Sequence, residues 1–290
     1  MDDGIYYDMP EAEYRALPYV NQSSLKTLVQ GGTPAHYKAA IEEDDNETDA
    51  KTFGKVVHSA ILTPQDFEAT QPLPEGIRSR RGKAYDDLIA ENPGITYLPL
   101  GEFTKHEENK RIAERIRHNF LEHPQCDTFM RECTYETVLI WTDIETGLKC
   151  KARLDMLAKD FSYISDIKTT SRPNIYMAAR SAYNYSYQVQ VAFYIDGLCT
   201  LTETQFDQPP MFFYAFVESF APYLCYVVDA RNAFDERVQD FITLGYMELG
   251  RKQYKSALKT VAQCEKTGVW EGYPIMEYEM VIPRYAESEF

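Results

Sequence analysis

Residues 150–170 read C-K-A-R-L-D-M-L-A-K-D-F-S-Y-I-S-D-I-K-T-T. We interpret 150–157 and 163–168 as two strands of a β-hairpin, joined by a turn around Asp160. In that register Asp155 and Asp166 lie nearly opposite each other, with Cβ atoms roughly 5 Å apart. Because side chains alternate along a strand, Lys168 shares a face with Asp166. The stretch therefore predicts two carboxylates and an ammonium group at one place on a hairpin.

These residue types fit metal-assisted hydrolysis of a phosphodiester. Two close carboxylates repel each other unless a cation lies between them, and Mg²⁺ prefers oxygen ligands. A lysine beside the metal can hold and help deprotonate the attacking water, or neutralise charge that develops on the phosphate. Lys168 is placed for either role. The alternative is an ordinary solvated hairpin with an acidic pair and a neighbouring lysine.

A second motif is the stretch 53–62, F-G-K-V-V-H-S-A-I-L, which predicts an apolar helix. Gly54 lies one turn before His58 and would let another backbone approach closely. His58 can then reach the site as a metal ligand. The alternative is a buried histidine that is satisfied by a backbone carbonyl.

A third motif follows the hairpin in the stretch 185–194, Y-S-Y-Q-V-Q-V-A-F-Y. Tyr187, Gln190 and Tyr194 stand at i, i+3 and i+7, which places them on one stripe of a predicted helix. A glutamine within an aromatic stripe suggests a hydrogen-bonding task. The alternative is a helix that simply faces the core.

In this order, G-x-x-x-H at 54–58, Asp155, D-x-K at 166–168 and Q-x-x-x-Y at 190–194, the motifs resemble RecB-type nucleases of the PD-(D/E)xK superfamily. The chain is most similar to the nuclease domain of RecE-type exonucleases (exodeoxyribonuclease VIII). The similar segments are N-Q-S-S-L-K-T-L, T-P-A-H-Y, the His58 helix, E-T-G-L-K-C-K-A-R-L-D, S-D-I-K-T-T and Y-N-Y-S-Y-Q-V-Q-V-A-F-Y-I-D-G, spread over about residues 20–200. The resemblance implies an α/β fold with a restriction-endonuclease-like core, in which helices flank a mixed sheet.

The resemblance also implies an activity and partners. It points to a Mg²⁺-dependent 5′→3′ exonuclease, with Mn²⁺ as a substitute, that releases 5′-mononucleotides from linear double-stranded DNA. The 3′ single-stranded overhang would pass to a RecT-like single-strand annealing protein. Resemblance to ring-forming exonucleases implies a ring-shaped homo-oligomer. A phage or prophage origin is expected because RecE carries a long preceding region, whereas the nuclease motifs here begin near Met1.

Carried over by position, the resemblance assigns roles to individual residues. The implied metal ligands are His58, Asp155, Asp166 and the carbonyl of Ile167, and Lys168 is the implied catalytic lysine. Gln190 and Tyr187 would flank the site. Glu136, in the strand before the hairpin, matches an acidic position that could order a metal-bound water or a second cation, although a lone glutamate on a strand is more often a solvated residue.

Charge is the main argument against a DNA-binding protein, because the chain carries a net charge of −15. The positive charge is locally dense, however. We expect the basic run formed by Arg78, Arg80, Arg81 and Lys83 to hold DNA phosphates, with Ser23 and Ser24 near the 5′ end. An acidic exterior with a focused positive lining would suit an enzyme that threads a DNA end through a channel.

Composition bounds the remaining expectations. The chain has 290 residues, of which 26% are charged and 44% hydrophobic, which permits one large domain over 1–290. We expect a mainly helical part at 1–125, an α/β catalytic core at 130–265 and a tail at 266–290 that could pack on a neighbouring subunit. No apolar run approaches 18 residues and no secretion signal is evident, which favours the cytoplasm. Six scattered cysteines argue against zinc, disulfides and an iron–sulfur cluster.

The local pattern also predicts individual elements. The expected strands are 135–141, 148–157, 163–168, 211–217 and 222–228. The expected helices are a short one capped by Asn21 or Ser23, the His58 helix after Asp49, 101–120, 174–198, and one that Asp229 caps and that runs towards Gln263.

Two functions of other kinds stay open. One is a structure-specific or end-trimming DNA endonuclease of the same fold. The other is a DNA-binding protein without catalysis, since a fold does not by itself determine a function.

Overall fold

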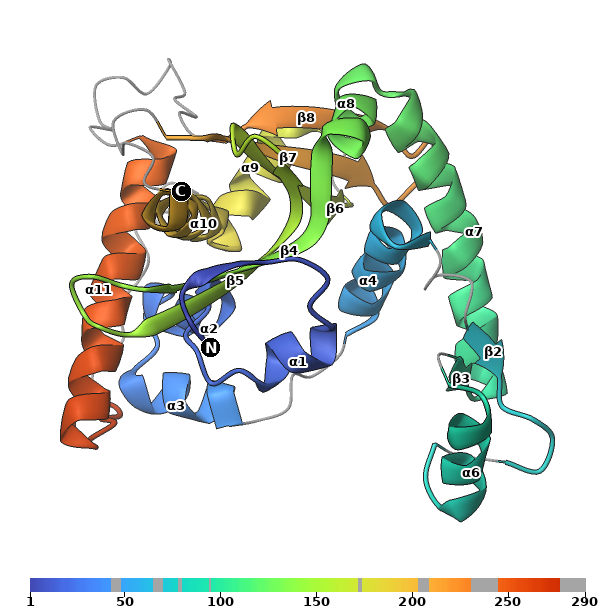
Figure 1. Ribbon diagram of the computed structural model, residues 1–290, viewed down its shortest axis with the longest axis horizontal. Coiled ribbons are helices and arrows are strands. Elements are labelled where there is room, and N and C mark those ends of the chain that lie inside the picture. The colour runs from blue at the N-terminus through green and yellow to red at the C-terminus, as the bar shows by residue number, and fades with distance from the viewer. Residues whose placement is uncertain are drawn as a thin grey trace, which may run out of the picture.

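A mixed sheet in the order β1-β4-β5-β6-β7-β8 forms the centre of the fold (Figure 1). The computed structural model describes residues 1–42, 48–64, 70–77, 80–93, 95–171, 174–202, 209–230 and 245–276. The strands of this sheet are β1 (Gly4–Tyr6), β4 (Cys133–Thr142), β5 (Lys149–Ala158), β6 (Tyr163–Thr170), β7 (Met211–Glu218) and β8 (Cys225–Asp229). Within it, β6 and β7 run parallel and every other neighbouring pair is antiparallel. The predicted hairpin and the two later strands are thereby confirmed.

The connection between the parallel strands β6 and β7 consists of two helices, α9 (Ile175–Asn184) and α10 (Tyr187–Thr202). The prediction of one helix over 174–198 was therefore wrong. Ser186 has a φ of 58°, in the left-handed region, so the chain turns between the two helices. As a result Tyr187 stands at the beginning of α10, beside the carboxyl-terminal half of β6.

One face of the sheet is covered by α10 together with α2 (Gln22–Val29), α3 (Pro34–Glu42) and α11 (Tyr246–Thr267). Asn21 caps α2 as expected, since its side chain accepts a hydrogen bond from the Ser24 amide. The helix α11 begins after Gly245, and the earlier part of the predicted helix, 231–244, lies outside the described residues. A Cβ on Gly250 would come within 1.8 Å of the Gln188 carbonyl oxygen. Glycine at this position therefore lets α11 pack directly on the α10 backbone.

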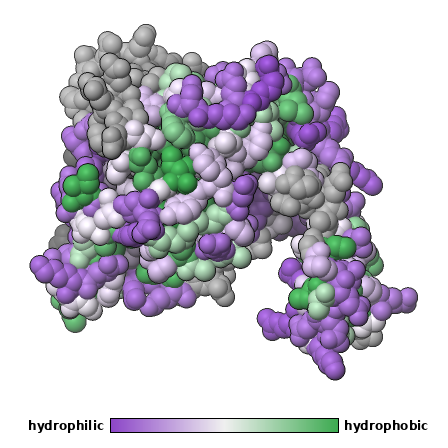
Figure 2. All heavy atoms as spheres, viewed as in Figure 1, coloured by the Kyte–Doolittle hydropathy of each residue, from purple (hydrophilic) through white to green (hydrophobic). Residues whose placement is uncertain are grey.

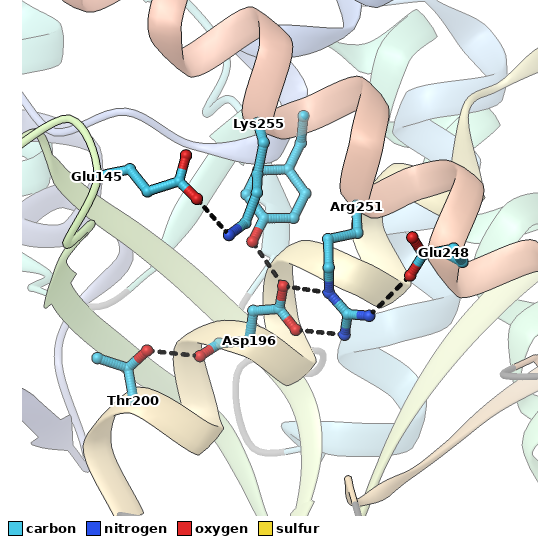
Figure 3. Close-up of polar contacts among 7 residues, drawn as sticks. Glu145, Asp196, Thr200, Glu248, Arg251 and Lys255 are labelled. Carbon is cyan, nitrogen blue, oxygen red and sulfur yellow. Dashed lines mark hydrogen bonds and ion pairs between the residues drawn. The ribbon is translucent and has the colours of Figure 1, made fainter. Parts of the chain in front are cut away.

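A buried carboxylate also joins α10 to α11 (Figure 3). The Asp196 carboxylate accepts hydrogen bonds from Arg251 Nε at 2.7 Å and Nη2 at 2.6 Å, and from the Tyr254 hydroxyl at 2.6 Å. Asp196 is only 7% exposed, so each of these bonds compensates for a desolvated charge. On the surface above it, Glu145 pairs with Lys255.

The opposite face is covered by α4 (Asp49–Leu62), α7 (Leu100–Glu122) and α8 (Pro124–Glu132). The side chains of Val57 and Ile61 on α4 and of Ile116 and Phe120 on α7 are fully or almost fully buried, together with Ile167 on β6. This apolar packing fixes α4, which carries His58, against the strand that carries Asp166. The predicted helix 101–120 is confirmed as α7.

At the edge of the sheet, β1 and the short helix α1 (Glu11–Ala16) cover Val138 and Ile140 of β4. The sequence did not predict β1. A three-residue strand has almost no pattern of its own, and it is defined here by its pairing with β4.

A part of the chain projects from the body at the beginning of α7 (Figure 1). It contains the parallel pair β2 (Thr70–Pro72) and β3 (Thr96–Leu98) and the helix α6 (Lys83–Glu91). Figure 2 shows this projection as mostly hydrophilic and separated from the body by a deep notch. Its surface is therefore available to solvent on several sides.

Three further observations concern the whole chain. All six cysteines are free thiols. Within the described ranges, no helix is both long and apolar enough to cross a membrane. The tail turns back onto its own chain at Trp270, whose ring stacks on Tyr37 with centroids 5.7 Å apart, and the part from 277 onward lies outside the described residues.

Candidate active site

The candidate site lies where β5 and β6 separate. The two strands pair at Met156–Ser165 and Leu157–Ile164, a register that brings Asp155 to the level of Asp166. Beyond these pairs, the Ile167 amide donates a hydrogen bond to Asp155 Oδ2 at 2.8 Å. This amide is therefore bonded to a side-chain carboxylate and not to a backbone carbonyl of β5. Both aspartates therefore lie at the opening between the strands.

Asp166 is bound by groups on its own strand and on α10. Its Oδ2 lies 2.5 Å from Lys168 Nζ, and its Oδ1 accepts a 2.5 Å hydrogen bond from Gln190 Nε2. The Asp166 side chain is 4% exposed, against 18% for Lys168. The structure thus brings together three of the residues that the sequence assigned to the site.

The Lys168 ammonium also faces an aromatic surface. It lies 4.8 Å from the ring centroid of Tyr187 and 5.7 Å from that of Tyr214. Burial lowers the pKa of Lys168, but the negative charge of Asp166 and the neighbouring Tyr187 and Asp155 raise it more, so that the net pKa is above the ordinary value. Lys168 is therefore a cation in the protein without metal, and it occupies the space beside Asp166 where positive charge is needed.

Asp155 is bound from the other helical layer. His58 on α4 places Nδ1 at 3.4 Å from Asp155 Oδ2 and Nε2 at 3.0 Å from the Ile167 carbonyl oxygen. Burial lowers the pKa of His58, while the Asp166 charge opposes the shift, so the ring is neutral at pH 7. His58 thus reaches the site and also forms a hydrogen bond with a backbone carbonyl. The two roles considered for it from the sequence, a residue of the site and a buried histidine satisfied by a carbonyl, are therefore compatible. At Gly54 the nearest neighbour of an added Cβ would be the Thr169 hydroxyl oxygen at 3.8 Å, so the expected close backbone approach is not present.

Glu136 lies at the same level of the sheet, between the pairs Tyr135–Met156 and Thr137–Leu154 that align β4 with β5. Its carboxylate forms an ion pair with Arg153 of β5. Its backbone φ is 51°, in the left-handed region, which is costly for a glutamate and is found more often at functional sites. Glu136 is close enough for its charge to raise the pKa of Asp155, so it belongs to the electrostatic environment of the site.

Two residues of this site were not found from the sequence. Tyr214 on β7 aligns with Asp166 in the parallel ladder, and its hydroxyl donates to the Tyr187 carbonyl at 2.9 Å and to Gln190 Oε1 at 3.3 Å. Lys26 on α2 lies 5.8 Å from the Tyr187 ring centroid. Burial and, to a smaller extent, the charge of Lys168 lower the pKa of Lys26 to about 8. Lys26 belongs to the stretch N-Q-S-S-L-K-T-L, one of the segments that resemble RecE-type exonucleases. Tyr214 belongs to no sequence motif.

The donor atoms fit a hard divalent cation. Asp166 Oδ2 is buried, accepts no hydrogen bond and has Lys168 as its ion-pair partner. Burial raises the pKa of Asp155 well above its ordinary value, and the Asp166 charge adds to this, so a cation between the two carboxylates would reduce their repulsion. In the tautomer that donates from Nε2 to Ile167, the His58 Nδ1 lone pair lies beside Asp155, as in many metal-binding histidines. Within the described residues, no three His, Cys, Asp or Glu side chains are grouped as a ready metal site, and the ion-pair partner of Asp166 is Lys168.

The predicted DNA-binding residues divide into two groups. Arg78 lies outside the described residues, and Arg80, Arg81 and Lys83 lie in the projection around α6, away from the β5–β6 opening (Figure 1). Arg80 Nη2 is 3.6 Å from Glu102 Oε2, and both side chains are about half exposed. The structure therefore does not bring the basic run and the aspartates into one cluster.

Ser23 and Ser24 form the second group, in the first turn of α2, which also carries Lys26. Ser24 takes part in the helix cap, because its hydroxyl donates to the Asn21 carbonyl at 2.8 Å. Ser23 is exposed, and its hydroxyl accepts from Gln22. Of the two, Ser23 is the one that faces solvent.

Comparison with known proteins agrees with this fold. The family described as PDDEXK-like domain of unknown function (DUF3799) matches residues 21–277. The crystal structure of a "Putative exonuclease" from Eubacterium rectale superposes with a TM-score of 0.52 at 14% identity, covering 93% of this chain and 97% of that one. No curated protein matches at a significant level. The chain has a PDDEXK-like nuclease fold and belongs to the family DUF3799.

Proposed function

We propose that this chain is a metal-dependent exodeoxyribonuclease of the RecE type, which digests linear double-stranded DNA from 5′ to 3′ with Mg²⁺. The observation that carries the proposal is the contact between Lys168 and the buried Asp166, with Asp155 and His58 on the adjoining strand and helix. Nucleases with this fold typically use a divalent metal ion, and the oxygen-rich donor set suits Mg²⁺. The similarity to a "Putative exonuclease" supports the fold on which this activity rests.

Each residue of the site has a separate role in the proposed reaction. His58, Asp155, Asp166 and the Ile167 carbonyl would hold the cation, which when bound polarises a phosphate oxygen and acidifies water. Lys168 would hold the attacking water and neutralise charge on the phosphate. Gln190 fixes the orientation of Asp166 through the 2.5 Å hydrogen bond, and Tyr214 fixes Gln190 in turn. Glu136, held by Arg153, would order a water molecule near the cation.

Binding of DNA would use positive charge in two places. Lys26 and Ser23 stand on α2 next to the site, where they can contact the terminal phosphate. The basic run in the projection would contact the duplex farther from the reacting bond. The net charge of −15 of the whole chain then disfavours nonspecific binding.

The wider setting follows from the same resemblance. We propose a single nuclease domain over 1–290, a ring-shaped homo-oligomer, a cytoplasmic location in a bacterial host and transfer of the 3′ overhang to a RecT-like annealing protein. Mn²⁺ would replace Mg²⁺.

The test is digestion of linear duplex DNA labelled separately at its 5′ and 3′ ends, beside a supercoiled circle, with Mg²⁺ or EDTA. We expect Mg²⁺-dependent release of 5′-mononucleotides from the linear duplex alone, and its loss in Asp166→Ala. Asp160→Asn, in the exposed turn of the same hairpin, is the matched control and should retain activity. Cleavage of the circle would indicate an endonuclease, whereas equal activity in wild type and Asp166→Ala would refute the assigned site.

A further inference from the structure

A cavity of about 240 Å³ lies at the carboxyl ends of the parallel strands β6 and β7. It is formed by the end of β6, the start of the loop after β7, α4, α9 and the turn before α10. In open α/β sheets, ligands commonly bind outside the carboxyl ends of parallel strands. The cavity therefore lies where the topology favours a ligand.

The cavity adjoins the candidate active site. Tyr187 contributes to its wall, and the ring centroid of Tyr187 lies 4.8 Å from Lys168 Nζ. Thr169 and Thr170, which follow Lys168 on β6, line it as well. A group bound in this cavity would thus be next to a phosphate that reaches Lys168.

Aromatic side chains form part of the walls. Phe53, Tyr185, Tyr187 and Phe216 all contribute, and the rings of Tyr185 and Tyr187 stack with centroids 5.9 Å apart. Tyr185 is 60% exposed, so a large part of this residue is accessible to a ligand. Flat aromatic faces of this kind bind nucleobases by stacking.

The polar part of the lining consists of hydroxyl groups. Ser171, Ser181 and Ser219 contribute, and none of the described residues that line the cavity is charged. The Ser219 hydroxyl donates to the Thr170 carbonyl at 3.2 Å, which ties the ends of β6 and β7 together. A neutral lining suits the base and sugar of a nucleotide, whereas its phosphate is better placed beside Lys168.

We propose that this cavity binds the base and sugar of one unstacked nucleotide next to the scissile phosphate. Its volume is below the roughly 300–1,000 Å³ of pockets that enclose drug-sized ligands, so it accommodates one nucleoside unit and not a base pair. Because every base has an aromatic face, recognition by stacking is independent of sequence. The inference rests on the proposed nuclease activity and specifies how that activity selects an unpaired terminal residue.

The experiment combines a protein change with a substrate change. KM and kcat are measured for Mg²⁺-dependent digestion of a linear duplex whose terminal nucleotide, at the digested end, has a normal base or lacks it. We expect Tyr185→Ala to raise KM about tenfold for the normal substrate. Loss of the base should raise the wild-type KM to a similar extent, and the two changes together should add little more.

Two variants serve as controls. Tyr185→Phe retains the ring and should behave like wild type. Tyr183→Ala removes another exposed tyrosine, 52% exposed on α9 and outside the cavity, and should leave KM unchanged. Independent, multiplicative effects of Tyr185→Ala and base removal, or no effect of Tyr185→Ala, would overturn the inference. Absence of any DNA digestion by the wild type would instead refute the proposed function.

Discussion

Lys168 Nζ and Asp166 Oδ2 lie 2.5 Å apart on the same face of β6, at a point where the Asp166 side chain is almost completely buried. The pair forms because residues two apart on a strand point the same way. The ammonium is thereby held beside the carboxylate that is proposed to bind the cation. This relationship supports a chemical role for Lys168 that is separable from substrate binding.

Lys168→Ala should reduce DNA cleavage by roughly 10²–10³-fold, the usual range for loss of one group that stabilises charge in the transition state. Binding should remain within about twofold, because the proposed phosphate contacts of Lys26 and of the projection are retained. Cleavage is measured with Mg²⁺, and binding by fluorescence anisotropy with Ca²⁺. Lys159→Ala, an exposed lysine just before the turn of the hairpin, is the control. Parallel loss of binding and cleavage would contradict the separate role.

Mg²⁺ should raise the melting temperature of the wild type by several degrees at pH 8, because it binds the folded chain.

Burial, with Asp166 nearby, raises the pKa of Asp155, so the folded chain binds more protons than the unfolded chain above about pH 4. Stability without metal therefore falls as the pH rises towards the raised pKa of Asp155, and it remains lower above that value.

Asp155→Asn removes this unfavourable charge. The variant should melt at a higher temperature than the wild type in EDTA at pH 8, and Mg²⁺ should produce no further increase. Asp160→Asn should retain the Mg²⁺ response. A full Mg²⁺ response in Asp155→Asn, measured by differential scanning fluorimetry, would exclude Asp155 as a ligand.

Binding of DNA should weaken about three- to tenfold between pH 7 and pH 9, because burial lowers the pKa of Lys26 to about 8 and the ammonium is lost as the pH rises. Lys26→Arg stays charged and should bind equally at both pH values. Lys26→Met should bind weakly at both. The measurement is anisotropy with Ca²⁺, and a wild-type pH dependence in Lys26→Met would assign the effect to another group.

Asp196→Asn should lower the free energy of unfolding by roughly 3–5 kcal/mol, because it leaves the Arg251 guanidinium without its buried counter-ion (Figure 3). Glu248→Gln, which affects a half-exposed partner of the same arginine at 3.4 Å, should change it by less than about 0.5 kcal/mol. Both values come from urea unfolding at 25 °C. Similar losses of unfolding free energy in the two variants would show that the buried Asp196 contributes no more to stability than the half-exposed Glu248.

Gly250→Ala should destabilise the protein by roughly 1–3 kcal/mol or more, because the added methyl group collides with the Gln188 carbonyl and separates α11 from α10. Gly101→Ala in α7, where a Cβ has open space, should stabilise by up to about 1 kcal/mol. Urea unfolding of the two variants compares them directly. A neutral Gly250→Ala would mean that the helix contact can relax.

Much of the site was predictable because its spacing is local. Asp166 and Lys168 are two residues apart on one strand, and Asp155 lies across a short turn, so strand periodicity alone brings these three residues together. The hairpin and the strands around it were predicted correctly for the same reason. His58 and Gln190 were identified by resemblance, and the packing of α4 and α10 on opposite faces of the sheet explains how they reach the two aspartates.

Other features depend on contacts between distant segments. Tyr214 joins the site through the parallel pairing of β7 with β6, and β1 becomes a strand through its pairing with β4. The break between the helices α9 and α10 depends on one residue, Ser186, whose backbone is in the left-handed region although the surrounding pattern is that of a single helix. None of these three has a local signal that distinguishes it from its neighbours.

The sequence by itself determined the alternating strands, the amphipathic helices and the residue types of the site, because these follow from periodicities of two and 3.6 residues and from side-chain chemistry. Only the tertiary structure decided which charges from separate segments meet: Arg251 with Asp196, Arg153 with Glu136, and Arg80 with Glu102 in a projection away from the aspartates. Electrostatic interactions depend on distance and burial in three dimensions, and the position of a charge along the chain specifies neither.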